Sequence, residues 1–140
     1  VVFSGSPRTL YEAFGDGRTA GLVAMLDGLF GRANVKVVEL RVREATSVRR
    51  NSARLVCSVC GMPMLAHARI SRCAFCAGAM RRRTLDDPRV IRVRLKEYRD
   101  RTYPIFRKMR GLRRTVQRVD GEPPPFAVHR AIARYLGRSR

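Results

Sequence analysis

Hydrophobic positions follow two different periods along the chain, and the change of period marks the expected elements. The segment Val35–Val42 (VKVVELRV) is rich in β-branched residues and predicts a strand. A second strand is expected over Thr115–Val119, closed by the turn Asp120-Gly121. The short apolar run Val1–Ser4 predicts a further, buried strand that stops at Gly5-Ser6-Pro7.

Helices are expected between these strands, where apolar residues return every three or four positions. The segment Thr19–Phe30 carries one apolar stripe, and Gly31 stands where a C-cap belongs. Pro104 should kink or restart the helix that begins at Pro88. Further helices are expected over Leu10–Phe14, over Thr46–Ser52, and after Pro123-Pro124-Pro125. Strands that alternate with helices favour an α/β fold with a mostly parallel sheet.

The composition changes between Arg54 and Thr84, where short turn-rich segments hold all four cysteines. This stretch is interpreted as an inserted module. The sequence therefore predicts three parts, namely residues 1–54, an insert over 55–84, and residues 85–140.

The chain is strongly basic. Its 140 residues include 30 Lys and Arg against 11 Asp and Glu, which gives a formal charge of +19. Such an excess of basic residues is typical of proteins that bind a partner rich in phosphate, such as nucleic acid or a nucleotide. The alternative is an arginine-rich composition in which most guanidinium groups are only solvated. A hydrophobic content of 45% excludes a disordered basic tail, and no apolar run is long enough to span a bilayer.

The four cysteines form two C-x2-C pairs separated by 12 residues, at Cys57, Cys60, Cys73 and Cys76. Each pair can point two sulfur atoms at one centre, and four thiolates make a closed tetrahedral Zn²⁺ site. Such a zinc ion would hold the module together and do no chemistry. Two disulfides or free thiols are the alternatives, and disulfides are disfavoured in a chain without secretory features. Gly61 and Gly78 should supply backbone freedom at the two pairs, and His67 is interpreted as a surface residue.

Several segments resemble, in the same order, the adenylate kinase family of nucleoside monophosphate kinases. Val2–Thr9 (VFSGSPRT) resembles the family's DGFPRT segment, and Arg50 and Arg54 resemble its two lid-entry arginines. The pair Asp86-Asp87 resembles the acidic pair that follows the zinc lid of many bacterial members. The helix Pro88–Pro104 and the segment Arg118–Gly121 resemble the family's R-L-x-x-Y-x-x-x-T-x-P helix and last strand. The resemblance implies a P-loop NTPase-like parallel sheet with flanking helices and an inserted zinc-ribbon lid at 55–84.

The resemblance also implies roles for single residues in phosphoryl transfer from ATP to AMP. Arg8 would bind the acceptor phosphate, while Arg50, Arg54 and Arg94 would close on the transferring phosphates. Arg118 would flank the donor adenine, Glu12 would lie against the acceptor base, and Asp86 and Asp87 would orient the arginines of the lid. Fixed guanidinium forks suit this chemistry, because the enzyme must align two nucleotides and neutralise charge. ATP would bring Mg²⁺, and the intact protein is expected to be a cytoplasmic monomer.

The chain also departs from the family pattern. It contains no Gly-rich phosphate loop of the form G-x-x-x-x-G-K, so we expect a C-terminal portion that alone transfers no phosphate. Ser4 replaces an Asp that organises Mg²⁺, and Glu12 replaces a Gln that reads the acceptor adenine. Thr84 takes the register of another lid arginine, for which Arg83 would substitute after a shift of one residue.

A different class of function is also compatible with the sequence. A zinc-ribbon protein that binds RNA or the ribosome would use the same cysteine pairs and the run Arg81-Arg82-Arg83. Against this alternative, Phe75 is the only aromatic residue in the ribbon, and base stacking needs aromatic platforms.

Overall fold

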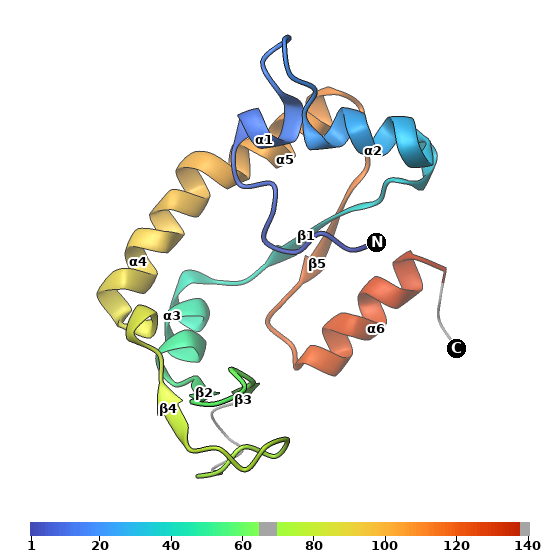
Figure 1. Ribbon diagram of the computed structural model, residues 1–140. Coiled ribbons are helices and arrows are strands. Elements are labelled where there is room, and N and C mark those ends of the chain that lie inside the picture. Colours follow the sequence, from blue (N-terminus) through green and yellow to red (C-terminus); the bar gives the residue numbers. More distant parts are fainter. Residues whose placement is uncertain (65–69, 138–140) are drawn as a thin grey trace. The chain divides into compact units, whose positions relative to one another are not determined.

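The computed structural model describes residues 1–64 and 70–137, and the chain divides into two compact units (Figure 1). Unit 1 comprises Val1–Val42 and Lys96–Arg140, and unit 2 comprises Arg43–Leu95. Unit 2 is longer than the predicted insert 55–84, because a helix on each side clusters with the cysteine-rich part. The division into 1–54, 55–84 and 85–140 stays a prediction. His67 lies outside the described residues.

Unit 1 contains a two-stranded parallel sheet. Strand β1 (Val37–Arg41) pairs with β5 (Val116–Asp120), and Glu39 lies opposite Arg118 in the register. Directly after β5, Gly121 donates its N–H to the carbonyl of Arg41, the last residue of β1, at 2.8 Å. The predictions of an α/β fold and of a parallel sheet are confirmed, with strand ends shifted by one or two residues.

The helices of unit 1 pack on this sheet. They are α1 (Leu10–Phe14), α2 (Leu22–Phe30), α5 (Tyr103–Gly111) and α6 (Pro125–Tyr135), with a 3-10 turn at Arg32–Asn34. Gly31 caps α2 with φ 76°, as the sequence predicts. The core consists of Ala13, Val23, Ile105 and Met109, against which Val37 and Val116 pack. One face of the sheet therefore contacts the core. Among the described residues, no helix is long and apolar enough to cross a membrane.

One expectation for unit 1 is wrong. Val1–Ser4 forms no strand, and the side chains of Val1 and Val2 are 100% and 90% exposed. The predicted helix with its apolar stripe is present as α2, in which Val23 is buried while Met25 and Leu29 are exposed. A short apolar run becomes a strand only when a neighbouring strand satisfies its backbone groups, and no described strand pairs with residues 1–4.

Unit 2 is a helix followed by a small antiparallel ribbon. Helix α3 (Glu44–Ser52) leads into β2 (Leu55–Cys57), which lies between β3 (Pro63–Met64) and β4 (Met80–Arg82). A 3-10 turn (Thr84–Asp86) then leads to α4 (Pro88–Glu97). Among the described residues of this small ribbon, the buried apolar ones are Val56, Cys57 and Cys73. The ribbon therefore needs a further source of stability.

The predicted break at Pro104 takes the form of a π-helical turn. Helix α4 ends at Glu97, the π turn spans Tyr98–Thr102, and α5 begins at Tyr103 with Pro104 in its first turn. Proline has no N–H to donate to the carbonyl four residues earlier, so the regular helix is interrupted before it. The chain restarts as a helix where proline is tolerated.

Candidate functional site

The four cysteines converge in unit 2. The Sγ atoms of Cys57, Cys60, Cys73 and Cys76 all lie within 4.8 Å of one another. Cys57 and Cys73 are buried, whereas Cys60 and Cys76 are exposed, and all four are free thiols. The closest approaches join one pair to the other, at 3.4 Å between Cys57 and Cys76 and 3.6 Å between Cys60 and Cys73. These distances are longer than a disulfide bond, and the cluster could hold a metal ion.

Backbone groups prepare two of the sulfurs for the thiolate form that binds a metal. The N–H groups of Cys60 and Val59 donate to Cys57 Sγ at 3.5 and 3.4 Å, and they lower the pKa of Cys57 from 9.0 to about 6. The N–H groups of Phe75 and Cys76 likewise lower the pKa of Cys73. The donor set fits a metal such as zinc, because thiolates rather than thiols are the ligands.

The two cysteine pairs turn in the same way, with different residues. Gly61 follows the first pair with φ 71°, and its N–H donates to the carbonyl of Cys57 at 3.2 Å. Ala77 follows the second pair with φ 56°, and its N–H donates to Cys73 at 2.9 Å. The predicted role of Gly61 is therefore confirmed. Gly78 was expected to supply backbone freedom at the second pair, and this expectation is wrong, because Gly78 has no positive φ. A Cβ there would lie 2.8 Å from Cys57 Sγ, so only glycine leaves that sulfur its place.

A carboxylate-guanidinium pair lies beside the ribbon. Arg54, directly before β2, donates from Nε and Nη2 to the two oxygens of Asp86, at 3.0 and 2.7 Å. Asp86 is buried at 5% exposure, and its turn after β4 places it against the start of β2. Two parallel bonds fix the plane of the guanidinium group. This geometry fits the orienting role that the resemblance implies for Asp86, and that role stays a prediction.

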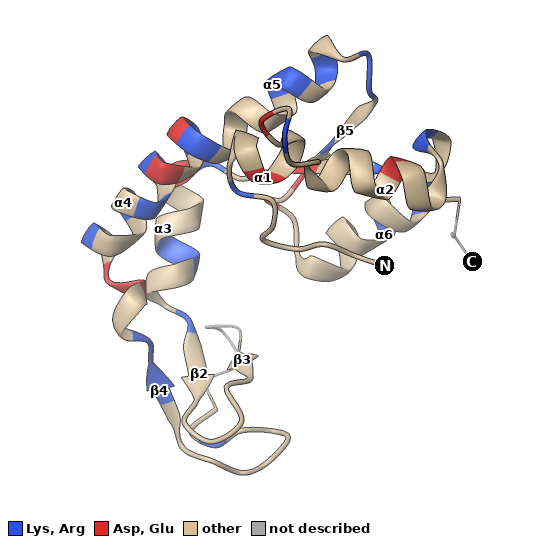
Figure 2. Cartoon of the chain, turned by 45° about the horizontal axis from the view of Figure 1, so that its top comes forward, with Lys and Arg blue, Asp and Glu red and all other residues tan. Residues whose placement is uncertain are grey.

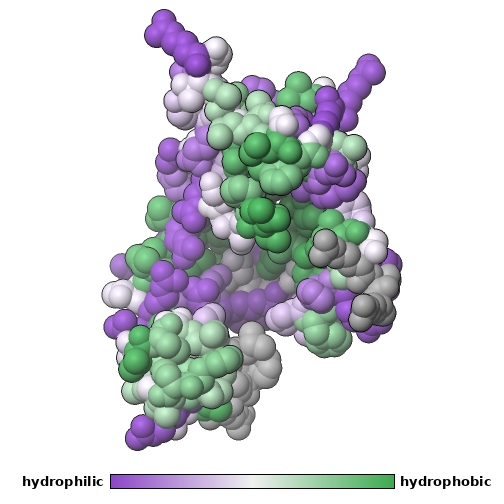
Figure 3. Space-filling view, turned by 45° about the vertical axis from the view of Figure 1, so that its right-hand side comes forward, coloured by the Kyte–Doolittle hydropathy of each residue, from purple (hydrophilic) through white to green (hydrophobic). Residues whose placement is uncertain are grey.

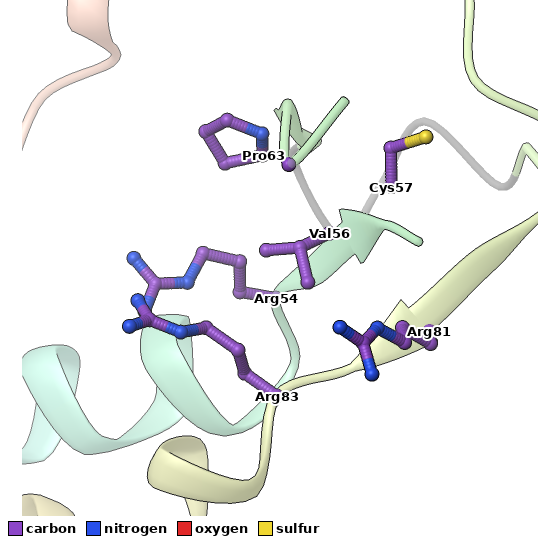
Figure 4. Close-up of a pocket in the computed structure, with 7 residues that line it drawn as sticks. Arg54, Val56, Cys57, Pro63, Arg81 and Arg83 are labelled. Carbon is purple, nitrogen blue, oxygen red and sulfur yellow. The ribbon is translucent and has the colours of Figure 1, made fainter. Parts of the chain in front are cut away.

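Three arginines surround a hollow on this side of the ribbon. The hollow has a volume of about 330 Å³ and is lined by Arg54, Val56, Cys57, Gly61, Pro63, Arg81 and Arg83. Figure 4 shows the side chains of Arg54 and Arg83 extending in the same direction. Arg83 thus lies near Arg54, although Thr84 is the residue that stands at the position of the family's lid arginine. Arg81 was not among the predicted site residues.

The other predicted residues of unit 2 lie on helices. Arg50 is in α3 and Arg94 in α4, and both side chains are exposed. Asp87 precedes α4 and accepts a hydrogen bond from the N–H of Arg89 at 2.8 Å, which caps the helix. Figure 2 shows Lys and Arg recurring along α4 and on β4, whereas most of α3 is formed by other residues.

The remaining candidates belong to unit 1. Arg8 donates from Nε to the carbonyl of Gly5 at 2.6 Å, and its backbone carbonyl accepts from Thr102 at 3.0 Å. The carboxylate of Glu12 accepts from the N–H of Arg8 at 2.7 Å, while its own N–H donates to Thr9 at 3.1 Å. This exchange resembles a capping box and holds the loop that carries Arg8. Glu12 therefore has a local structural partner, which the sequence analysis did not foresee.

Arg118 belongs to a cluster that the sequence analysis missed. Glu39 is buried at 2% exposure, and its carboxylate lies 3.5 Å from Arg118, 3.7 Å from Arg41, and against the guanidinium of Arg110. Burial, followed by the charge of Glu39, raises the pKa of Tyr98. The signal was present in the strand Val35–Val42, where period 2 places Glu39 on the same face as the core residue Val37.

No family model matches the chain. The adenylate kinase of Erythrobacter litoralis is 35% identical over 86% of the chain, and that of Sphingopyxis alaskensis is 34% identical over 98%. The adenylate kinase of Rhizorhabdus wittichii is 34% identical over 97%. The chain spans 55%, 61% and 62% of the lengths of these relatives.

These relatives favour the kinase interpretation over the RNA-binding alternative. They match the chain across both units, so the similarity does not rest on the cysteine-rich ribbon alone. Over the stretch that these relatives match, the chain is similar to adenylate kinases.

Proposed function

We propose that this chain supplies the arginine side of a site that transfers a phosphoryl group between ATP and AMP. The bond between the γ-phosphorus and its bridging oxygen breaks, and a bond to an oxygen of the AMP phosphate forms, so two ADP result. The protein's task is to align the two nucleotides and to neutralise the charge of the moving group. The observation that carries the proposal is the pair of Arg54 with the buried Asp86, which holds one guanidinium group in a fixed plane.

The other arginines take the roles that the family resemblance implies. Arg8 binds the acceptor phosphate, and Arg50 and Arg94 close with Arg54 on the transferring phosphates. Arg118 flanks the donor adenine, supported by its contact with Glu39. Asp87 contributes to the turn that carries Asp86, because it caps the following helix. Glu12 acts on the acceptor base only if it leaves the N–H of Arg8, which makes weak base selection the expected result.

Two metal ions belong to the proposal. Zinc, held by the four cysteines, stabilises the ribbon and has no open position for chemistry. Magnesium arrives with the phosphates of ATP, and near Val2–Thr9 the chain offers it the hydroxyl group of Ser4 in place of a carboxylate. Free thiols in a metal cluster also fit a reducing compartment such as the cytoplasm, where a monomer is expected.

We further propose that a phosphate-binding loop outside these 140 residues completes the site. The sequence contains no G-x-x-x-x-G-K motif, and among the described strands β1 pairs with β5 alone. Figure 3 shows hydrophobic side chains on the surface, and those exposed in unit 1 include Val1, Val2, Phe3, Leu40 and Val42. Parallel sheets are normally covered on both faces and have more than two strands. A further apolar strand that ends in such a loop would cover this surface.

An assay of the purified chain tests the proposal. With ATP, AMP and Mg²⁺, we expect no ADP from the chain alone, and ADP formation once a segment with the strand and loop is supplied. ADP formation by the chain alone would show that the proposed loop is not needed. Failure of the completed protein to form ADP would contradict the proposed reaction.

Binding gives a second test that does not need the loop. A diadenosine oligophosphate, which spans donor and acceptor sites, should raise the melting temperature of the chain. Arg94→Gln should reduce this shift, whereas Arg92→Gln, on the same helix, should not. Equal losses in the two variants would indicate that general positive charge, rather than a site, binds the ligand.

A further inference from the structure

The dipeptide Asp-Gly occurs three times in the chain, at Asp16-Gly17, Asp27-Gly28 and Asp120-Gly121. The side-chain carboxyl of an aspartate can be attacked by the backbone nitrogen of the residue that follows it. Glycine hinders this attack least, because it has no Cβ and its backbone turns most freely. The three dipeptides are identical in sequence, so their surroundings in the fold decide which of them reacts.

The fold holds two of the three glycine nitrogens. Gly28 lies inside α2, where its N–H belongs to the helical hydrogen bonds, and the carboxylate of Asp27 is paired with Arg114. The N–H of Gly121 donates to the carbonyl of Arg41 at 2.8 Å. Gly121 is also buried, and a Cβ on it would lie 2.6 Å from a neighbouring side chain. Neither nitrogen can approach the preceding carboxyl without the loss of a hydrogen bond.

Asp16-Gly17 lies instead in the loop that joins α1 to α2 and projects beyond both helices (Figure 1). Both residues are exposed, and Gly17 has φ 92°. No atom beyond its two chain neighbours lies within 4 Å of the place where a Cβ would be. Among the described residues, none accepts a hydrogen bond from the N–H of Gly17. The nitrogen of Gly17 is therefore free to approach the carboxyl of Asp16.

The carboxyl of Asp16 is held close to this part of the backbone. Its Oδ1 accepts hydrogen bonds from the N–H groups of Thr19 and Arg18, at 2.9 and 3.0 Å, which folds the side chain over the loop. The same bonds lower the pKa of Asp16, and only the neutral carboxyl loses water, so the reaction is slow. Asp120 accepts a bond of the same type from the N–H of Glu122 at 2.9 Å. The two carboxyls are thus held alike, and the glycine nitrogen is what distinguishes the two pairs.

We propose that Asp16-Gly17 is a site of spontaneous isomerisation in the folded chain, and that the fold protects the other two Asp-Gly pairs. The nitrogen of Gly17 forms a bond to Cγ of Asp16, the carboxyl hydroxyl leaves with the amide proton as water, and a succinimide ring results. Water then opens the ring. Opening at Cγ restores aspartate, whereas opening at the backbone carbonyl carbon gives isoaspartate, through whose Cγ the chain continues. One water leaves and one returns, so the reaction needs no other reactant, and it does not depend on the proposed function.

The modified residue would not fit the loop, because isoaspartate adds one methylene group to the backbone. A Cβ on Gly15 would lie 1.8 Å from the carbonyl oxygen of Thr19, and one on Gly21 would lie 2.4 Å from the backbone of Phe14. The bridge that closes the loop at Gly15 therefore has no room for the extra group. We expect the loop to open, and trypsin to cleave after Arg18 faster than in the unmodified chain.

Incubation of the zinc-loaded chain near neutral pH, followed by peptide mapping, tests the inference. Electron-transfer fragmentation in the mass spectrometer distinguishes isoaspartate from aspartate and assigns it to one of the three sites. Asp16 should accumulate isoaspartate at least about threefold faster than Asp27 or Asp120, since each of those sites must first break a hydrogen bond. In urea, where the fold is lost, the three sites should react at similar rates.

Two variants complete the test. Asp16→Glu keeps the charge but requires a larger ring that forms more slowly, so most of the isoaspartate of the folded chain should disappear. Asp120→Glu is the matched control and should leave the isoaspartate content unchanged, while circular dichroism shows that both variants are folded. A smaller difference between the sites, or no isoaspartate at Asp16 in a folded sample whose urea-treated counterpart has reacted, would overturn the proposal. The same holds if Asp16→Glu retains the isoaspartate content of the unmodified chain.

Discussion

Glu39 lies directly opposite Arg118 in the parallel ladder of β1 and β5, and its carboxylate is buried on the face that packs on the core. Arg110 from α5 and Arg41 from the same strand contact the same carboxylate. A buried charge is tolerated only when its partners replace the lost water. The carboxylate of Glu39 therefore connects β1, β5 and α5, and it supplies the counter-charge for all three arginines.

Replacing Glu39 with Gln should lower the free energy of unfolding by about 2 kcal/mol, because the change leaves partly buried guanidinium groups without their counter-charge. The three arginines are partly exposed, so water replaces some of the lost interaction and the loss stays below that of a fully buried pair. Urea unfolding measures it. Glu97→Gln is the control, since its pair with Arg101 at 3.2 Å is solvent-exposed and is worth about 0.5 kcal/mol or less. Equal losses would contradict a special role for Glu39.

Tyr98 should lose its phenolic proton later than a free tyrosine. Burial, and then the charge of Glu39, raises its pKa above the ordinary 10.0. The folded chain keeps this proton at pH values where the unfolded chain has lost it, so the stability it contributes below pH 10 declines as the pH rises further. Phenolate absorbance measures the titration. In Tyr98→Phe the decline above pH 10 should be smaller, and an unchanged decline would show that another group causes it.

The pair of Arg54 with Asp86 should stabilise unit 2. Asp86→Asn removes the charge from a buried partner of two hydrogen bonds, and we expect a loss of about 2 kcal/mol in unfolding free energy. Asp87→Asn is the matched control, because asparagine also caps a helix N-terminus and should cost only a few tenths of a kcal/mol. Denaturant unfolding of both variants provides the comparison. A greater loss in Asp87→Asn would mean that the helix cap, rather than the ion pair, holds this turn.

The cysteine cluster should bind one zinc ion per chain and release it in acid. Protons compete with the metal for thiolates, and the pKa of Cys57 near 6 places the loss of metal below about pH 6. In the metal-free chain the unfolded state holds a proton on Cys57 between about pH 6 and 9.0 that the folded state has released. Stability should therefore rise with pH across this range. Metal content measured against pH checks the first effect, with Cys57→Ser as the variant that should not retain zinc. Retention of full metal content at pH 4 would contradict the assignment.

The elements with strong local signals could be predicted from the sequence. β1 and β5 were predicted to within two residues because their β-branched runs are long enough to stand out, and α1 and α2 end at the predicted residues Phe14 and Phe30. Val1–Ser4 failed as a strand because a strand depends on a partner, and none of the described strands provides one.

The candidate site was predictable where its chemistry is local. Two C-x2-C pairs specify a metal cluster by spacing alone, and all four sulfurs converge. The clusters around Glu39 and around the hollow of unit 2 were not predicted, because each depends on strand register. Arg81 and Arg82 are indistinguishable in sequence, and the pairing of β2 with β4 alone places one of them at the hollow.

The turn after each cysteine pair provides the last prediction. Gly61 and Ala77 hold equivalent positions with φ of 71° and 56°, a region that costs a residue with a Cβ about 1 kcal/mol or more. Ala77→Gly should therefore stabilise the ribbon by about 0.5 kcal/mol, since relief of this strain exceeds the added freedom of the unfolded chain. Gly61→Ala should destabilise it by a similar or larger amount. Thermal unfolding of the zinc-loaded chain measures both changes, and a loss of stability in Ala77→Gly would mean that its methyl group packs favourably.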